Sequence, residues 1–218
     1  KVEIPGRTFL SIPGYADKVE FGVLVSFAYQ VEDTNEEIVV ATTRIETMLG
    51  DTAVAVHPKD ERYTHLHGKF VKHPFVNRRM PIVLDEFVDM NFGTGAVKIT
   101  PAHDPNDYEV GKRHDLPFIT IFSDDGFVVG DYGKFTGMKR FDARKAVLAS
   151  LKELGMYKDT QNNPMVVPVC SRSKDIVEPL IKPQWYVKCS DMAANATEAV
   201  RSGELKIIPE SQTKIWYH

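Results

Sequence analysis

The chain has 218 residues and a formal net charge of −3, with 43% hydrophobic and 26% charged residues, which is close to the average of globular proteins. This composition excludes collagen-like, low-complexity and coiled-coil proteins. The longest apolar stretch, residues 21–28, is far shorter than the roughly 20 residues of a membrane-spanning helix.

Cys170 and Cys189 are too few for a disulfide scaffold and suit a reducing compartment, so we expect a cytoplasmic protein without a membrane partner. The sequence starts at Lys1 and shows no signal-peptide pattern. We therefore expect a piece of a longer protein.

Short runs rich in Val, Ile and Phe, separated by Gly, Pro or Asp, predict β-strands through the first two thirds of the chain. The clearest runs are residues 20–31, 38–42, 52–56, 69–75, 81–84, 96–100, 118–122 and 127–129, with a turn at residues 124–126. We expect an α+β fold with a curved or closed β-barrel core and a few peripheral helices.

Three helices are predicted around this core. Residues 142–154 carry an apolar stripe that stops at Gly155, and a second helix should begin at Ser190, a good N-cap, and end near residue 202. A third, short helix should follow Asp104, because Pro105 suits the first helical position. This third start lies in the part of the sequence with the strongest functional signals.

The domain organisation follows from a boundary signal at residues 162–164, Asn-Asn-Pro. We expect an incoming linker at residues 1–18 and a β-barrel domain at residues 19–164. Residues 165–218 would form a return segment that contains the second helix.

Several standard motifs are absent from the sequence. In a dinucleotide-binding loop that opened at Gly93, the third glycine would fall on Lys98, and neither Gly-x-Ser-x-Gly nor His-Glu-x-x-His occurs. Cys170 looks like half of a zinc knuckle whose second cysteine is replaced by Ser173, so we expect no metal. A metal-dependent hydrolase that uses His103 and Asp104 stays open as an alternative.

Residues 80–110 are strongly acidic, with six Asp or Glu residues and a single basic residue, Lys98. Such a stretch favours an ammonium group over a phosphate. Asp107, in the first turn of the predicted helix, is placed to receive an ammonium in a charge-assisted hydrogen bond. The plainer alternative is that Asp104 caps the helix and Asp107 completes a capping box.

Two segments, ATTRIETMLGD at residues 41–51 and NFGTGAVKITPAHDPNDY at residues 91–108, carry a specific resemblance. They resemble the editing domain inserted in class I valyl-, isoleucyl- and leucyl-tRNA synthetases, and both look closest to the valyl members. The similarity continues through residues 163–168 and 183–187, where the chain would return to the catalytic body of the synthetase. The ATP-binding motifs of that body are absent here, so the resemblance implies no aminoacylation by this chain.

The resemblance implies a proofreading hydrolase that removes threonine from mischarged tRNA(Val) by attack of water on the aminoacyl ester. Its partner would be the acceptor end of that tRNA, and no cofactor is implied. Asp107 would anchor the α-ammonium, while Lys98 and Thr100 would polarise or orient the carbonyl. The implied substrate-binding residues are Thr42, Thr43, Arg44, Thr47, Phe92 and Asp104.

These residues also have simpler explanations. The threonines are ordinary strand formers, Arg44 could form a surface ion pair, and Phe92 could pack in the core. Hydroxyl groups nevertheless suit a site that recognises another hydroxyl. A second function stays open as well, a module that positions the tRNA acceptor end and does not hydrolyse the ester by itself.

Overall fold

The computed structural model describes residues 1–217, and the chain forms two units, Lys1–Ile181 and Lys182–His218. Within the described residues, no helix combines the length and the apolar character needed to cross a bilayer. The division of the chain at residues 18 and 164 stays a prediction about organisation in a longer protein.

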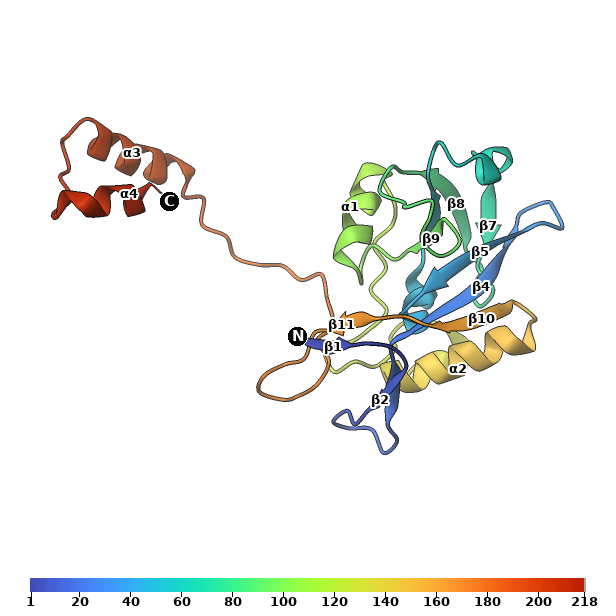
Figure 1. The fold of residues 1–218 in the computed structure, drawn as a ribbon. Coiled ribbons are helices and arrows are strands. Elements are labelled where there is room, and N and C mark those ends of the chain that lie inside the picture. The colour runs from blue at the N-terminus through green and yellow to red at the C-terminus, as the bar shows by residue number, and fades with distance from the viewer. Residues whose placement is uncertain (218) are drawn as a thin grey trace. The chain divides into compact units, whose positions relative to one another are not determined.

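The first unit is built on a strongly curved sheet (Figure 1). Its strands are β4 (Val23–Val31), β5 (Glu37–Thr42), β6 (Ala53–Val56), β7 (Phe70–Lys72), β8 (Arg79–Leu84), β9 (Ala96–Ile99) and β10 (Tyr157–Asn162). Their order is β10-β4-β7-β8-β6-β9, with β5 also paired to β4. β6 pairs with β8 in parallel, whereas the other pairs are antiparallel.

The sheet nearly closes into a barrel, because β5 packs against β9. Alternate residues of β4 point into the interior, as expected for a strand with one buried face. The buried set on β4 includes Val23, Val25, Phe27, Tyr29 and Val31. The structure thus confirms the predicted α+β fold with a barrel-like core.

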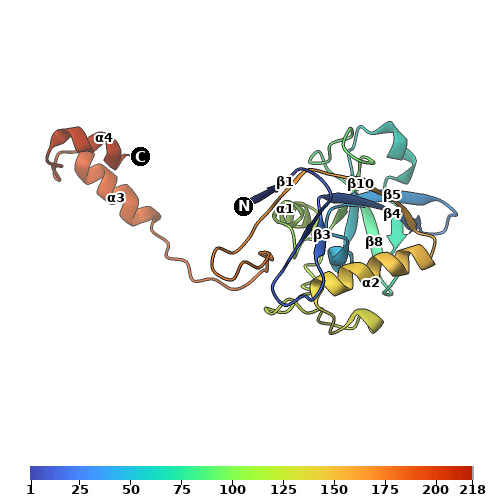
Figure 2. The same ribbon diagram turned by 60° about the horizontal axis from the view of Figure 1, so that its bottom comes forward.

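Helices lie around this core. α2 (Arg140–Glu153) packs against β10 and against the 3₁₀ helix η1 (Ile45–Gly50), and it lies along the sheet in Figure 2. α1 (Pro105–Arg113) follows β9, and two further 3₁₀ helices lie in connections, η2 (Glu61–Leu66) between β6 and β7 and η3 (Gly133–Phe135) between α1 and α2. The two predicted helices of this unit are confirmed, α2 starting two residues earlier than expected.

Two short strand pairs extend the barrel unit. β1 (Val2–Ile4) pairs with β11 (Met165–Val167), and β2 (Thr8–Leu10) pairs with β3 (Val19–Phe21). Ile4, Phe21 and Val167 form a second apolar cluster with Phe141 of α2. This cluster joins both ends of the unit to the helix.

The single strand predicted over residues 20–31 is divided into β3 and β4 at Gly22. Gly22 has φ +74°, and a Cβ there would lie 2.0 Å from the carbonyl oxygen of Gly6. Only glycine fits this close approach, so the chain turns where an uninterrupted apolar run predicted continuous strand.

The strands predicted at residues 118–122 and 127–129 are wrong. This region forms loops with isolated bridges, such as the one between Phe122 and Val128, around the confirmed turn in which Gly126 N–H donates to Ser123. The reason is that the N–H of Ile121 donates to the His103 ring and not to a strand partner. The His103 side chain therefore binds the backbone N–H that Ile121 would donate in a β-ladder.

The second unit contains α3 (Ser190–Arg201), the 3₁₀ helix η4 (Glu210–Gln212) and α4 (Thr213–Trp216), and none of their described residues is buried. The predicted helix at 190–202 is confirmed within one residue. Its cap is not, because Cys189 takes the N-cap position without a side-chain bond and Ser190 is already helical.

Candidate active site

A cavity of about 220 Å³ lies at the end of β5, beside β9 and the start of α1. Its lining contains all nine residues selected from the sequence: Thr42, Thr43, Arg44, Thr47, Phe92, Lys98, Thr100, Asp104 and Asp107. Two segments that lie about 50 residues apart in the chain therefore form the walls of one pocket.

The first wall is the turn that leads from β5 into η1. The Thr42 hydroxyl accepts the N–H of Arg44 at 3.0 Å, and the Thr47 hydroxyl donates to the Arg44 carbonyl at 2.9 Å. Both threonines are buried, so they shape the turn and are more than surface strand formers. The Thr42 hydroxyl can still donate its proton, and the Thr47 hydroxyl can still accept.

The second wall contains a buried group of charges on β9. Lys98 Nζ donates to Asp51 Oδ1 at 2.9 Å and also bonds to Thr100 Oγ1, while Thr100 Oγ1 donates to the same Asp51 oxygen at 2.5 Å. Tyr29 donates to the other Asp51 oxygen at 2.7 Å. Asp51 therefore neutralises the charge of Lys98 inside the wall, and the lysine keeps one N–H for another acceptor.

Asp107 is buried in this wall, with 7% of its surface exposed. Its Oδ2 accepts the backbone N–H of Thr100 at 2.8 Å. Burial raises the pKa of this carboxyl to about 7, since the opposing effects of Lys98 and the Thr100 N–H do not offset it and Asp104 and Asp51 raise it further. Within residues 1–217, no basic side chain forms an ion pair with Asp107.

Asp104 is the N-cap of α1, because its carboxylate accepts the N–H groups of Asn106 and Asp107 at 2.8 and 3.2 Å. The capping prediction for Asp104 is thus confirmed. The capping-box alternative for Asp107 is wrong, since its carboxylate turns to Thr100 on β9. Asp107 is left facing the cavity with Asp104 beside it.

Phe92 lies at the cavity and is 57% exposed, so it is not a core residue. The tight turn after it needs Gly95, which has φ +73° and donates to the Phe92 carbonyl at 3.1 Å. A Cβ on Gly95 would lie 2.2 Å from the Arg62 guanidinium. The glycine-rich segment therefore forms a tight turn that places Phe92 at the cavity.

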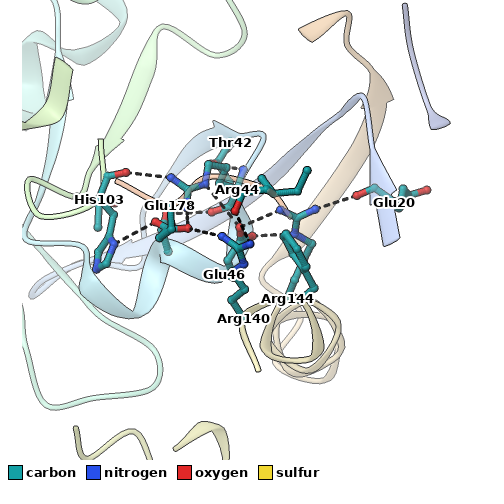
Figure 3. Close-up of polar contacts among 12 residues, drawn as sticks. Glu20, Thr42, Arg44, Glu46, His103, Arg140, Arg144 and Glu178 are labelled. Carbon is teal, nitrogen blue, oxygen red and sulfur yellow. Dashed lines mark hydrogen bonds and ion pairs between the residues drawn. The ribbon is translucent and has the colours of Figure 1, made fainter. Parts of the chain in front are cut away.

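Arg44 connects the two walls (Figure 3). Its Nη1 donates to the carbonyl of His103 at 2.9 Å and its Nη2 donates to Glu178 at 2.5 Å, with Glu46 at 3.6 Å. Glu46 in turn receives two 2.8 Å bonds from Arg144 of α2. Although burial alone would raise the pKa of Glu46, Arg144 and Arg44 lower it to about 2.

His103 uses both ring nitrogens within the protein. Nε2 accepts the N–H of Ile121 at 2.9 Å, which assigns the proton to Nδ1, 3.2 Å from Glu178 Oε1. The metal-hydrolase alternative thereby loses its histidine ligand. In the described part of the chain, no three His, Cys, Asp or Glu side chains gather as a metal site would require.

A family of known proteins and a solved structure indicate the class of this chain. The family described as "Leucyl-tRNA synthetase, editing domain" matches residues 59–127, which include most of the second wall. A solved structure titled a ternary complex of Agrobacterium radiobacter K84 agnB2 LeuRS with tRNA and LeuAMS has a TM-score of 0.53 at 19% identity. The similarity covers 80% of this chain and 28% of that one, and it shows that the fold is shared.

The sequence relatives are more specific. "Valine--tRNA ligase" of Takifugu rubripes is 67% identical over 218 residues, which is 100% of this chain and 18% of that protein. The protein of the same name from Rattus norvegicus is 64% identical, over 100% of this chain and 17% of its own length. Relatives named as mitochondrial enzymes also match.

The chain therefore belongs to the editing domains of the class I valyl-, leucyl- and isoleucyl-tRNA synthetases, in the branch of valine--tRNA ligase. It spans less than a fifth of the length of these curated relatives. The resemblance seen in the two sequence segments is confirmed.

Proposed function

We propose that this editing domain hydrolyses the ester bond of threonyl-tRNA(Val). The observation that supports this function is the buried Asp107 carboxyl, which faces the cavity without an ion-pair partner among the described residues. An aminoacyl ester carries an α-ammonium, and a charge-assisted hydrogen bond to Asp107 would supply the missing positive charge. Free threonine and the unacylated tRNA would be the products.

The proposed reaction begins when water attacks the ester carbonyl carbon. The bond from that carbon to the ribose oxygen then breaks, and the ribose oxygen takes up a proton as it leaves. The remaining N–H of Lys98 would polarise the carbonyl, and the Thr100 hydroxyl, which accepts from Lys98 and donates to Asp51, would orient the lysine. Accurate positioning of ester and water would provide most of the acceleration.

The same proposal gives the other cavity residues roles in binding. Thr42, Thr43 and Thr47 would contact the hydroxyl of threonine, and Phe92 would pack against the terminal adenine or the substrate methyl group. Arg44 would hold the shape of the wall through its bonds to His103 and Glu178, and Asp104 would fix the start of α1.

The need for such a site follows from the size of the two amino acids. Threonine and valine are isosteric, and a hydrophobic pocket rejects the added hydroxyl only about 10²-fold, a figure that comes from valyl-tRNA synthetases and not from this structure. A second site that binds the hydroxyl can hydrolyse the product that the first site fails to reject. Valine lacks that hydroxyl and would leave buried polar groups unpaired.

The test is to mix the purified chain with threonyl-tRNA(Val) or valyl-tRNA(Val) and follow loss of each ester. We expect rapid loss of the threonyl ester and slow loss of the valyl ester, after subtraction of spontaneous hydrolysis. If the chain binds the acceptor end but deacylates neither ester at high protein concentration, it is a positioning module and the proposal is wrong.

We further propose that the tRNA acceptor end is the partner of the cavity, in keeping with the tRNA complex named for the structural neighbour. Aminoacylation and ATP binding would belong to the catalytic body of a parent synthetase. A cytoplasmic location, expected from the cysteine content, is part of the same proposal.

A further inference from the structure

Glu178 lies outside the cavity lining, yet its carboxylate connects three of the segments around the cavity. Oε2 receives Arg44 Nη2 at 2.5 Å and lies 3.3 Å from Arg140 Nη1, while Oε1 is 3.2 Å from His103 Nδ1 (Figure 3). The side chain is 10% exposed, and although burial alone would raise its pKa, the bond from His103 and the ion pair with Arg44 lower it. Such a buried carboxylate is held in one position.

The contacts of Glu178 reach both walls of the cavity. Arg44 belongs to the turn after β5, and His103 immediately precedes Asp104, the N-cap of the helix that carries Asp107. Arg44 also bonds directly to the His103 carbonyl, so these three residues form a closed set of contacts across the two walls. Without the carboxylate, Arg44 loses its shortest ion pair and keeps the longer one to Glu46 at 3.6 Å, and the His103 Nδ1–H loses its acceptor.

We propose that Glu178 is a positioning residue of the editing site, which sets the separation of the wall that binds the amino-acid side chain from the wall that anchors the α-ammonium. This inference rests on the proposed deacylation. Because Glu178 does not touch the cavity, its replacement should disturb the alignment of the ester and water more than the binding of tRNA. Small misplacements of reacting groups are costly in rate.

The test compares Glu178→Gln with Asp175→Asn in the whole chain. Asp175 lies on the same segment and pairs with the same Arg140 at 2.9 Å, but it contacts neither Arg44 nor His103. We expect Glu178→Gln to lower kcat for threonyl-tRNA(Val) about tenfold with KM changed less than about twofold, and Asp175→Asn to change both less than about twofold. Equal effects of the two variants, or a change confined to KM, would overturn the proposal.

Thermal melts and an activity-independent measurement accompany the kinetics. ¹⁵N-resolved NMR of His103 should show the Nδ1–H tautomer in the parent chain, with an Nδ1–H signal that moves in Glu178→Gln and stays in place in Asp175→Asn. An unchanged His103 signal in folded Glu178→Gln would overturn the positioning role. If the parent chain does not deacylate, the proposed function fails, whereas the NMR comparison still decides whether Glu178 holds His103.

Glu178→Asp provides a second variant in case Glu178→Gln does not fold. It keeps the charge and shortens the side chain by one methylene group, so we expect folded protein with an intermediate kcat. A shortened carboxylate that supports the full rate would contradict a role in setting the separation of the walls.

Discussion

Glu46 and Asp107 are buried carboxyl groups in the two segments that meet at the cavity, and their pKa values move in opposite directions. Glu46 receives two bonds from Arg144 and lies near Arg44, which lowers its pKa to about 2. Asp107 receives one backbone N–H, and burial raises its pKa to about 7. The cation nearest in the wall, Lys98, is already neutralised by Asp51.

This difference separates a structural carboxylate from one that is available to a ligand. The arginines of the region are used to hold the walls together, whereas the carboxyl inside the cavity has no counter-ion in the described chain. An ammonium group that binds in the cavity would stabilise the ionised form of Asp107, as Arg144 stabilises the ionised form of Glu46. Burying the Asp107 carboxylate without a counter-ion costs free energy. The ammonium of the proposed substrate would compensate this charge when it binds.

Replacing Glu46 should give the largest change, in stability. Glu46→Gln breaks a buried pair and leaves Arg144 without its bidentate partner, so we expect the free energy of unfolding to fall by about 3 to 5 kcal/mol. Denaturant unfolding measures this, with Glu37→Gln, which loses only the exposed pair to Lys158, as the matched control expected to change it by under about 1 kcal/mol. Similar losses of unfolding free energy in the two variants would show that the buried Glu46 pair stabilises the fold no more than an exposed pair does.

Replacing Asp107 should affect activity instead. Asp107→Asn removes the charge but keeps the size, and loss of a charged hydrogen bond costs roughly 1.5 to 3 kcal/mol, or about 10- to 150-fold in kcat/KM for threonyl-tRNA(Val). Asp104→Asn is the control, because asparagine caps a helix about as well as aspartate.

The stability of Asp107→Asn should move in the direction opposite to that of Glu46→Gln. A carboxyl whose pKa is raised in the folded state stabilises the fold below its unfolded pKa of 3.8, and this contribution disappears as the pH rises through about 7. At pH 8 the variant should therefore melt at a higher temperature than the parent chain. Deacylation at the full rate by folded Asp107→Asn would contradict the proposal that Asp107 binds the α-ammonium.

The two carboxyl groups should also respond to different ranges of pH. Since Asp107 must be ionised to bind an ammonium, kcat/KM should rise about tenfold per pH unit below pH 6 and level off above about pH 7, and Asp107→Asn should lack this inflection. The stability contributed by Glu46 is complete above pH 4.5 and is lost as the pH falls through about 2. A parent profile flat from pH 5.5 to 7.5 would contradict the Asp107 assignment.

Chelation should have the smallest effect. The candidate knuckle is interrupted at Ser173, whose N–H contacts the Cys170 sulfur at 3.5 Å, so we expect EDTA to leave deacylation unchanged. The assay is deacylation before and after chelation, with zinc added back. Activity that is lost with EDTA and restored by zinc would mean that a metal takes part.

The sequence predicts the strands in which apolar residues either alternate with polar ones or follow one another without interruption, because these patterns reflect burial of one face or of both faces. Residues 38–42 and 52–56 correspond to β5 and β6 within one residue for this reason. The pattern does not predict β10, because its sequence, YKDTQN, is polar and has no apolar alternation. Its place in the sheet depends on pairing with β4, a tertiary contact that local pattern does not contain.

The candidate site was predicted where its residues belong to compact motifs, and all nine line the cavity. The sequence does not single out Asp51, although it ends the first motif, because its importance comes from contacts with Lys98 and Thr100 across the sheet. For His103 the sequence suggests only the role of a metal ligand. Glu178 lies about 70 residues after the second motif, and its only local signal is an acid between apolar residues, Val177 and Pro179.

The pairing of β1 with β11 decides where this unit can be shortened. A fragment of residues 19–164 would lack both strands and Glu178, and would uncover Phe21 and Phe141, which now pack with Ile4 and Val167. Exposed apolar surface of this kind invites aggregation. A minimal proofreading fragment, for assay or for transfer into another host protein, should therefore keep the whole of Lys1–Ile181.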